Sequence, residues 1–122
     1  MALDIKDIPW VGRQLWAPDA AFKNGKYYLY FPAKDKSDVF RIGVATSTTP
    51  VGPFKAEAKP IEGSYSIDPA VFQDADGTSY MYFGGSGVVN YSAGALESTR
   101  QTDPKQTCRK TISLRSVPGW QR

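Results

Sequence analysis

The stretch WAPDAAFKNGKYYLYFPA, Trp16–Ala33, is followed about fifty residues later by SIDPAVFQDADGTSYMYFGG, Ser66–Gly85. Both stretches pass from an acidic residue beside a proline, through small residues and a Phe, to a polar turn with Gly. Both then end in a strand that reads Tyr-x-Tyr-Phe. The shared order indicates that one structural unit occurs twice. A repeat of this length is typical of proteins built from stacked units.

The alignment of the two copies rests on positions that match at an offset of 52 residues. These are Gly25 with Gly77, Tyr28 with Tyr80, Leu29 with Met81, Tyr30 with Tyr82 and Phe31 with Phe83. The offset between Phe22 and Phe72 is only 50, so the alignment predicts that the second turn is two residues longer. Both turns contain a Gly, which accepts the positive φ that a tight hairpin reversal needs.

Each unit is expected to contain four strands. The aromatic strand 26–33 is expected to be buried on both faces. VFRIGVATS, residues 39–47, follows as the next strand, and a short fourth strand runs through Phe54. Four strands in about fifty residues are typical of a β-propeller blade. The alternative is two unrelated hairpins of a β-sandwich.

The sequence therefore predicts an all-β fold that is a partial β-propeller, about one and a half blades with an irregular C-terminal tail. Because blades bury their faces against one another, so few cannot close a propeller. We therefore interpret the chain as a fragment.

Charge and aromatic content change near Gly85. Residues 1–85 carry nine Lys and Arg against ten Asp and Glu, whereas residues 86–122 carry six against two. Fourteen aromatic residues lie in the first part and two in the second. We therefore divide the chain into an incomplete propeller domain, 1–85, and a tail, 86–122.

The residue types present limit the chemistry. The chain has no His and a single Cys, Cys108. This excludes a Ser-His-Asp triad, a Cys-His pair and a His-ligated zinc site built from this chain alone. Acid–base chemistry therefore has to use carboxylates, Tyr, Lys or the one thiol.

Three segments resemble blades two and three of the family 43 glycoside hydrolases. They are LWAPDAAFKNGKYYLYFPAKDK (15–36), FRIGVATSTTPVGPF (40–54) and SYSIDPAVFQDADGTSYMYFGG (64–85). The resemblance covers about residues 2–85. It implies a five-bladed propeller and the activity of a β-xylosidase, α-L-arabinofuranosidase or endo-arabinanase. The substrate it implies is a pentose-containing glycan.

The resemblance also implies a role for Asp68. An inverting glycosidase needs a general base and a general acid, and a nearby carboxylate raises the pKa of the acid. In the family the base is an Asp of blade one, the acid is a Glu of blade four, and the carboxylate that raises the pKa of the acid is an Asp of blade three. Asp68 in SIDP matches this third residue. A turn acid is the alternative. The base Asp has no counterpart, and Glu97 lacks the context of the acid. We therefore expect the chain alone not to hydrolyse glycosides.

Trp16 and Asp19 are the candidate substrate-binding residues. They lie at the corresponding strand start of the preceding blade, where Trp16 can stack on a sugar face. The alternative for Trp16 is packing between blades. Asp74 and Asp76 are interpreted as turn formers, because the other ligands of a calcium loop are missing. No metal and no cofactor is expected.

The tail departs from the family pattern after Gly85. Read one nucleotide out of frame, the codons of Ser86–Ser92 can encode Leu or Ile, then Trp-Gly-Gly-Gln-Leu-Gln, which the family usually shows here. We interpret residues 86–122 as out of frame or disordered. The alternative is a basic segment that contacts phosphates, without the interleaved aromatics of a nucleic-acid module.

Two further function classes stay open beside a hydrolase fragment: a non-catalytic carbohydrate-binding propeller and an interaction protein with a basic tail. No nucleic acid, membrane or oligomer partner is expected. The chain carries neither a secretory signal nor a run of 18 apolar residues, so as written it is expected to be cytoplasmic. The compartment of a longer parent is not predicted.

Overall fold

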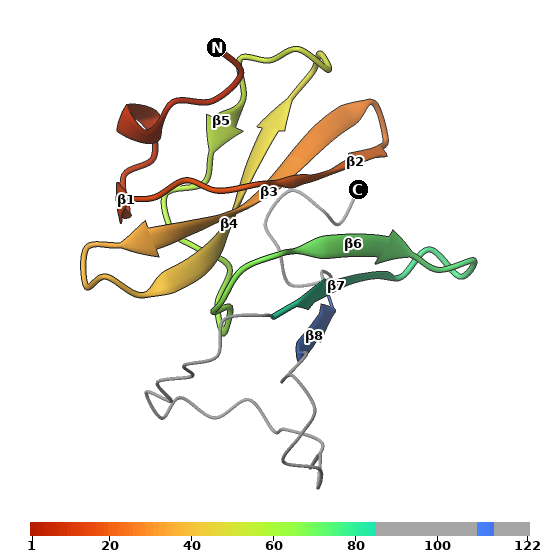
Figure 1. The fold of residues 1–122 in the computed structure, drawn as a ribbon. Coiled ribbons are helices and arrows are strands. Elements are labelled where there is room, and N and C mark those ends of the chain that lie inside the picture. The colour runs from red at the N-terminus through yellow and green to blue at the C-terminus, as the bar shows by residue number, and fades with distance from the viewer. Residues whose placement is uncertain (85–109, 114–122) are drawn as a thin grey trace, which may run out of the picture.

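The computed structural model describes residues 1–84 and 110–113, which form two antiparallel β-sheets (Figure 1). The first sheet and its lead-in contain η1 (Ile5–Asp7), β1 (Val11–Arg13), β2 (Asp19–Lys23), β3 (Lys26–Asp35), β4 (Phe40–Ser47) and β5 (Lys55–Ala56). The second contains β6 (Ala70–Gln73), β7 (Ser79–Phe83) and β8 (Lys110–Ser113). Within the described ranges, no helix has the length and apolarity that a membrane crossing needs.

The first sheet contains the four strands expected of one unit, β2, β3, β4 and β5, in that spatial order. An additional short strand, β1, pairs with the far end of β3, on the same edge as β2. β5 begins one residue after Phe54 and has two residues, so the short fourth strand follows Phe54 and does not run through it. Prolines 50 and 53, which have no N–H to donate, limit the ladder before it.

The two hairpin turns differ by one residue, not by the two that the alignment predicted. Asn24 and Gly25, at φ values of 51° and 77°, make a two-residue turn of the mirror-image kind. In the second hairpin the Asp74 N–H donates to the Thr78 carbonyl at 2.7 Å, so the turn holds residues 75–77.

The strand registers show that Phe22 and Phe72 do not occupy corresponding positions. Phe22 pairs with Tyr27, whereas Phe72 pairs with Tyr80. Since Tyr28, not Tyr27, corresponds to Tyr80, the two phenylalanines occupy different faces of their sheets. The alignment of Phe22 with Phe72 was therefore wrong by one residue.

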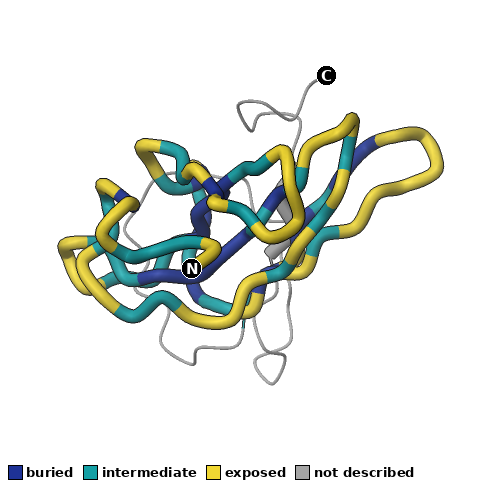
Figure 2. The backbone as a smooth tube through the Cα atoms, turned by 90° about the horizontal axis from the view of Figure 1, so that it is seen from above, coloured by how far each residue is buried: buried dark blue, intermediate teal, exposed yellow. Residues whose placement is uncertain are grey.

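Alternate side chains of β3 enter two separate cores, as period-two geometry requires. Tyr28 and Tyr30 enter a core between the two sheets, which we call the inter-sheet core. Its members are Tyr28, Tyr30, Ile42, Val44, Ile61, Met81 and Phe83. The expected burial of this strand on both faces is thus confirmed for its centre, and Figure 2 shows the exposed residues gathered in the turns.

The opposite face of β3 packs under the N-terminal segment. Phe31 and Ala33 contribute to this second core, which we call the N-terminal core. Its members are Ile8, Phe31, Ala33, Ala45 and Phe54. The Trp10 ring stacks on Phe31 with a centroid distance of 5.9 Å and an interplanar angle of 9°. The centre of the first sheet is therefore covered on both faces.

The second sheet repeats the face assignment of the first. Met81 and Phe83 face the inter-sheet core and are almost fully buried. Tyr80 and Tyr82 lie on the other face, and Tyr82 is 44% exposed. The Tyr-x-Tyr face of the first sheet thus packs on the Met81–Phe83 face of the second, so the two sheets stack through unlike faces, as successive propeller blades do.

Four residues of the predicted tail form a strand. β8 pairs along β7, with Lys110 opposite Phe83 and Ser113 opposite Tyr80. The predicted boundary at residue 85 and the frame-shift hypothesis remain predictions, since Ser86–Ser92, Glu97 and Cys108 lie outside the described residues.

Gly43 makes a testable contribution to packing. A Cβ at this position would lie 2.5 Å from Phe31 Cζ and 2.5 Å from Trp10 Cζ2. We expect Gly43→Ala to lower the free energy of unfolding by about 1–3 kcal/mol, because it overpacks two stacked rings. Chemical denaturation measures this change.

A second substitution supplies the control. Gly43→Ala in a Phe31→Leu background should cost less than in the parent chain, because one of the two rings that the added Cβ meets has been removed. An unchanged denaturation midpoint for Gly43→Ala would contradict this account of Gly43.

Candidate active site

Asp68 lies in a strained turn at the start of β6. Ser66 and Asp68 have φ values of 67° and 53°, a region that costs a non-glycine residue about 1–2 kcal/mol. The Ser66 side chain is buried, whereas Asp68 is exposed. Between them, the Ile67 carbonyl accepts a hydrogen bond from Gly84 N at 2.9 Å. The turn therefore holds a carboxylate outward on a backbone of restricted conformation.

The segment that precedes Asp68 is anchored to β4. The Ser64 side chain is buried; its Oγ accepts from Ile42 N at 3.0 Å and donates to Ile61 O at 2.5 Å. Arg41 Nη1 donates to the Ser64 carbonyl at 3.2 Å. Sequence reasoning missed Ser64, because nothing in a serine marks a hydrogen bond to a strand 22 residues away.

Asp19, the first residue of β2, reaches across to the second sheet. Its Oδ2 accepts a hydrogen bond from Val71 N at 2.7 Å. Its ladder partner is Tyr30. Burial raises the pKa of Tyr30 well above its ordinary value, and the neighbouring Tyr28 and the charge of Asp19 raise it further. The carboxylate of Asp19 thus lies beside a phenol that stays protonated.

Trp16 packs against its own sheet. Its ring lies 4.6 Å from the Phe40 ring at an interplanar angle of 49°, and its main-chain N–H donates to Pro32 O at 3.0 Å. Trp16 is 45% exposed. On Phe40, the Lys34 Nζ lies 5.4 Å from the ring centroid. Within the described residues, the ring of Trp16 therefore has one covered side and a large exposed area.

A hydrogen bond joins Asp19 to the strand that follows Asp68, whereas Asp74 and Asp76 lie at the other end of that strand. Val71, which binds Asp19, follows Asp68 by three residues on β6. Asp74 and Asp76 lie beyond the opposite end of β6 (Figure 1). Asp74 Oδ1 accepts from Ala75 N and Asp76 Oδ1 from Thr78 N, each at 2.7 Å, so both acids cap the turn.

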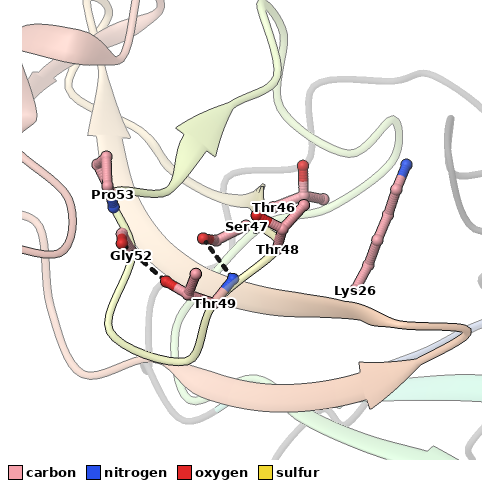
Figure 3. A pocket seen from close by; sticks show the side chains of 7 residues that line it. All are labelled: Lys26, Thr46, Ser47, Thr48, Thr49, Gly52 and Pro53. Carbon is pink, nitrogen blue, oxygen red and sulfur yellow. Dashed lines mark hydrogen bonds between the residues drawn. The ribbon is translucent and has the colours of Figure 1, made fainter.

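A hydroxyl-rich pocket of about 360 Å³ lies away from these acids (Figure 3). Its lining residues are Lys26, Thr46, Ser47, Thr48, Thr49, Gly52 and Pro53. Thr49 closes the turn beside it: its Oγ1 donates to Gly52 O at 2.8 Å and its N–H donates to Ser47 Oγ at 3.1 Å. Sequence reasoning did not single out this pocket. Among residues 1–84 and 110–113, no group of three acidic or thiol side chains could hold a metal ion.

Known proteins are similar to this chain in sequence. A xylosidase/arabinosidase 43A of Humicola insolens is 68% identical over 85 residues, 70% of this chain and 26% of that protein. A xylosidase/arabinosidase of Bacteroides ovatus is 62% identical over 85 residues, again 70% of this chain and 26% of that protein. The chain thus spans about a quarter of the length of these relatives.

Solved structures of similar enzymes resemble this chain in fold. The crystal structure of CoXyl43, a β-xylosidase/α-arabinofuranosidase from a compost microbial metagenome in complex with xylotriose, matches with a TM-score of 0.66 and 80% identity. The match covers 69% of this chain and 26% of that one. A Xanthomonas citri enzyme complexed with xylotriose matches with a TM-score of 0.78 and 47% identity, over 93% of this chain and 36% of that one.

These structures identify the two sheets as part of a five-bladed β-propeller. The family model of the glycosyl hydrolases of family 43 matches residues 3–122. The chain therefore belongs to glycosyl hydrolase family 43.

Proposed function

We propose that this chain is part of an inverting glycoside hydrolase that cleaves O-glycosidic bonds in glycans containing xylose or arabinose. Family membership and the names of the relatives support this activity class. The observation that carries the proposal is the Asp68 carboxylate, exposed at the start of β6 on a backbone with a positive φ. Strained backbone of this kind clusters at active sites.

The proposed role of Asp68 is electrostatic. Inversion needs a base that activates water and an acid that protonates the leaving oxygen, about 6.5–9.5 Å apart. The acid has to remain protonated near neutral pH, and a negative charge nearby raises its pKa. Asp68 supplies that charge in our proposal. The base and the acid would come from blades that residues 1–84 do not contain.

The sugar-contacting roles of Trp16 and Asp19 are also proposals. The exposed area of the Trp16 ring is suited to stacking on the apolar face of a pyranose or furanose. The carboxylate of Asp19 lies on the neighbouring strand start, from where it could bind a sugar hydroxyl. Exposure of Trp16 also favours the second candidate function, a propeller that binds glycan without cleaving it.

The proposed function makes a prediction about activity. The purified 122-residue chain should release no product from an aryl β-xyloside or an aryl α-L-arabinofuranoside, because it supplies only one of the three carboxylates. The full-length relative from Humicola insolens, assayed in parallel, serves as the positive control. Sustained turnover that follows the chain through purification would refute the proposed division of the catalytic residues.

The proposed role of Asp68 is tested in an enzyme that contains all five blades. Asp68→Asn removes a negative charge, so the pKa of the general acid falls. The alkaline limb of the kcat/KM profile should then move to lower pH, and kcat/KM at neutral pH should drop by at least about tenfold. Asp74→Asn, at the turn, is the matched control and should leave the profile in place.

A profile of Asp68→Asn with the parent's alkaline limb would contradict the electrostatic role. In that event Asp68 would be a turn acid, and the activity would depend on carboxylates elsewhere in the propeller.

The proposed contact of Trp16 with sugar is tested by NMR. Titration of the isotope-labelled chain with xylotriose should shift the indole N–H resonance of Trp16, because the sugar stacks on its exposed area. The resonance of Trp10, which packs on Phe31, is the internal reference and should not move. A Trp16 resonance that stays in place at millimolar sugar would count against stacking at this position.

A further inference from the structure

We propose that Asp19 is a positioning residue for Asp68: its carboxylate fixes the main chain of β6 at Val71 and so sets where the Ser66–Asp68 turn stands relative to the first sheet. This inference rests on the proposed function of Asp68. It concerns a role for Asp19 that differs from contact with sugar.

The contact itself is short and charge-assisted. Asp19 Oδ2 and Val71 N are 2.7 Å apart, at the short end of the range for an N–H bonded to a carboxylate. Both residues are partly buried. Asp19 is itself fixed, because its main chain lies in the β2–β3 ladder opposite Tyr30. A rigid strand of one sheet therefore presents an acceptor to a strand of the other.

The donor is an N–H that the second sheet does not use. Among residues 1–84 and 110–113, β6 is the edge strand of its sheet and pairs on one side only, with β7. An edge strand leaves alternate N–H groups without a ladder partner. The Val71 N–H finds its acceptor in Asp19, on the adjacent strand β2 of the first sheet. Removal of this acceptor would leave a partly buried N–H unsatisfied.

The ladders show that only the first unit has an acid at this position. Asp19 pairs with Tyr30, and the corresponding Tyr82 pairs with Ala70. Asp19 therefore corresponds to Ala70, and not to Asp68, which stands two residues earlier. The two acids look alike in sequence, yet one binds main chain and the other is exposed.

The turn between these anchors is held at both ends by the first sheet. At one end, Ser64 Oγ bonds to Ile42 of β4. At the other end, Val71 bonds to Asp19 of β2. Asp68 lies between them on a backbone with a φ of 53°. Because such backbone persists only where its surroundings determine it, the two anchors together set the direction of the Asp68 side chain.

The test uses amide hydrogen exchange, followed by NMR on the 122-residue chain. In Asp19→Ala, we expect protection of the Val71 amide to fall by about tenfold or more. Protection of Gly84, whose N–H bonds to Ile67 inside the turn, should fall with it. Amides in the middle of β3 and β4 should keep the parent's protection. Asp19→Asn keeps an oxygen acceptor and should restore most of the protection.

Asp38→Ala is the matched control. Asp38 lies in the connection between β3 and β4, is exposed and pairs with Arg13 and Lys34, and its removal should leave Val71 and Gly84 as in the parent. Unchanged protection at Val71 in Asp19→Ala would overturn the proposal. A uniform loss at every amide would overturn it too, since Asp19 would then stabilise the fold as a whole.

If Asp19→Ala does not fold, Asp19→Asn is compared with the parent chain. A tenfold loss of protection at Val71 in Asp19→Asn that leaves the protection of Gly84 and the resonances of Asp68 as in the parent would contradict positioning. None of these readouts depends on hydrolysis. If Asp68 has no electrostatic role, the pH profile of Asp68→Asn will match that of the parent. If Asp19 has no positioning role, amide hydrogen exchange in the Asp19 variants will show it.

Discussion

The contact between the two sheets is made by the aromatic strands of the repeat. Tyr28 and Tyr30 of one unit lie in the same core as Met81 and Phe83 of the next, all at 2% exposure or less. Each such side chain contributes about 1.5–3 kcal/mol when fully buried. Neither sheet could bury this surface alone, so the relative placement of β2 and β6, and with it every contact around the candidate site, depends on this core.

The inter-sheet core also explains why the two repeated stretches, residues 16–33 and 66–85, place their acids in different surroundings. The core fixes two neighbouring strand starts, one with Asp19 and one with Asp68. In the first unit the acid, Asp19, is the first residue of the ladder, where its side chain meets the edge of β6. In the second unit the acid precedes the strand, where Pro69 follows it and no ladder begins. A displacement of two residues along the strand therefore separates a main-chain contact from an exposed carboxylate.

Much of the fold could be predicted from sequence, because local rules decide it. The Tyr-x-Tyr-Phe match and the Gly-containing turns predicted the two hairpins and their stacking. Phe22 and Phe72 misled the alignment, since a one-residue difference in turn length reverses the face of every residue before it. β8 was not predicted, because it lies in a stretch without an aromatic pattern.

The candidate site was predicted only in part. A family motif pointed to Asp68, but neither the positive φ at Ser66 nor the anchor at Ser64 has a local sequence signal. The role proposed for Asp19 depends on an N–H that lies 52 residues away in the chain. Such contacts follow from the packing of the two sheets, which residue types at single positions do not specify.

The most direct test of the central claim is to sequence the genomic DNA and the transcript on both sides of this reading frame. The account predicts further propeller blades, with an Asp encoded upstream for the base and a Glu encoded downstream for the acid. It also predicts that the blade pattern continues after Gly85 in the frame shifted by one nucleotide. Flanking sequence without blades, or blades without these two acids, would contradict a hydrolase in which Asp68 assists catalysis.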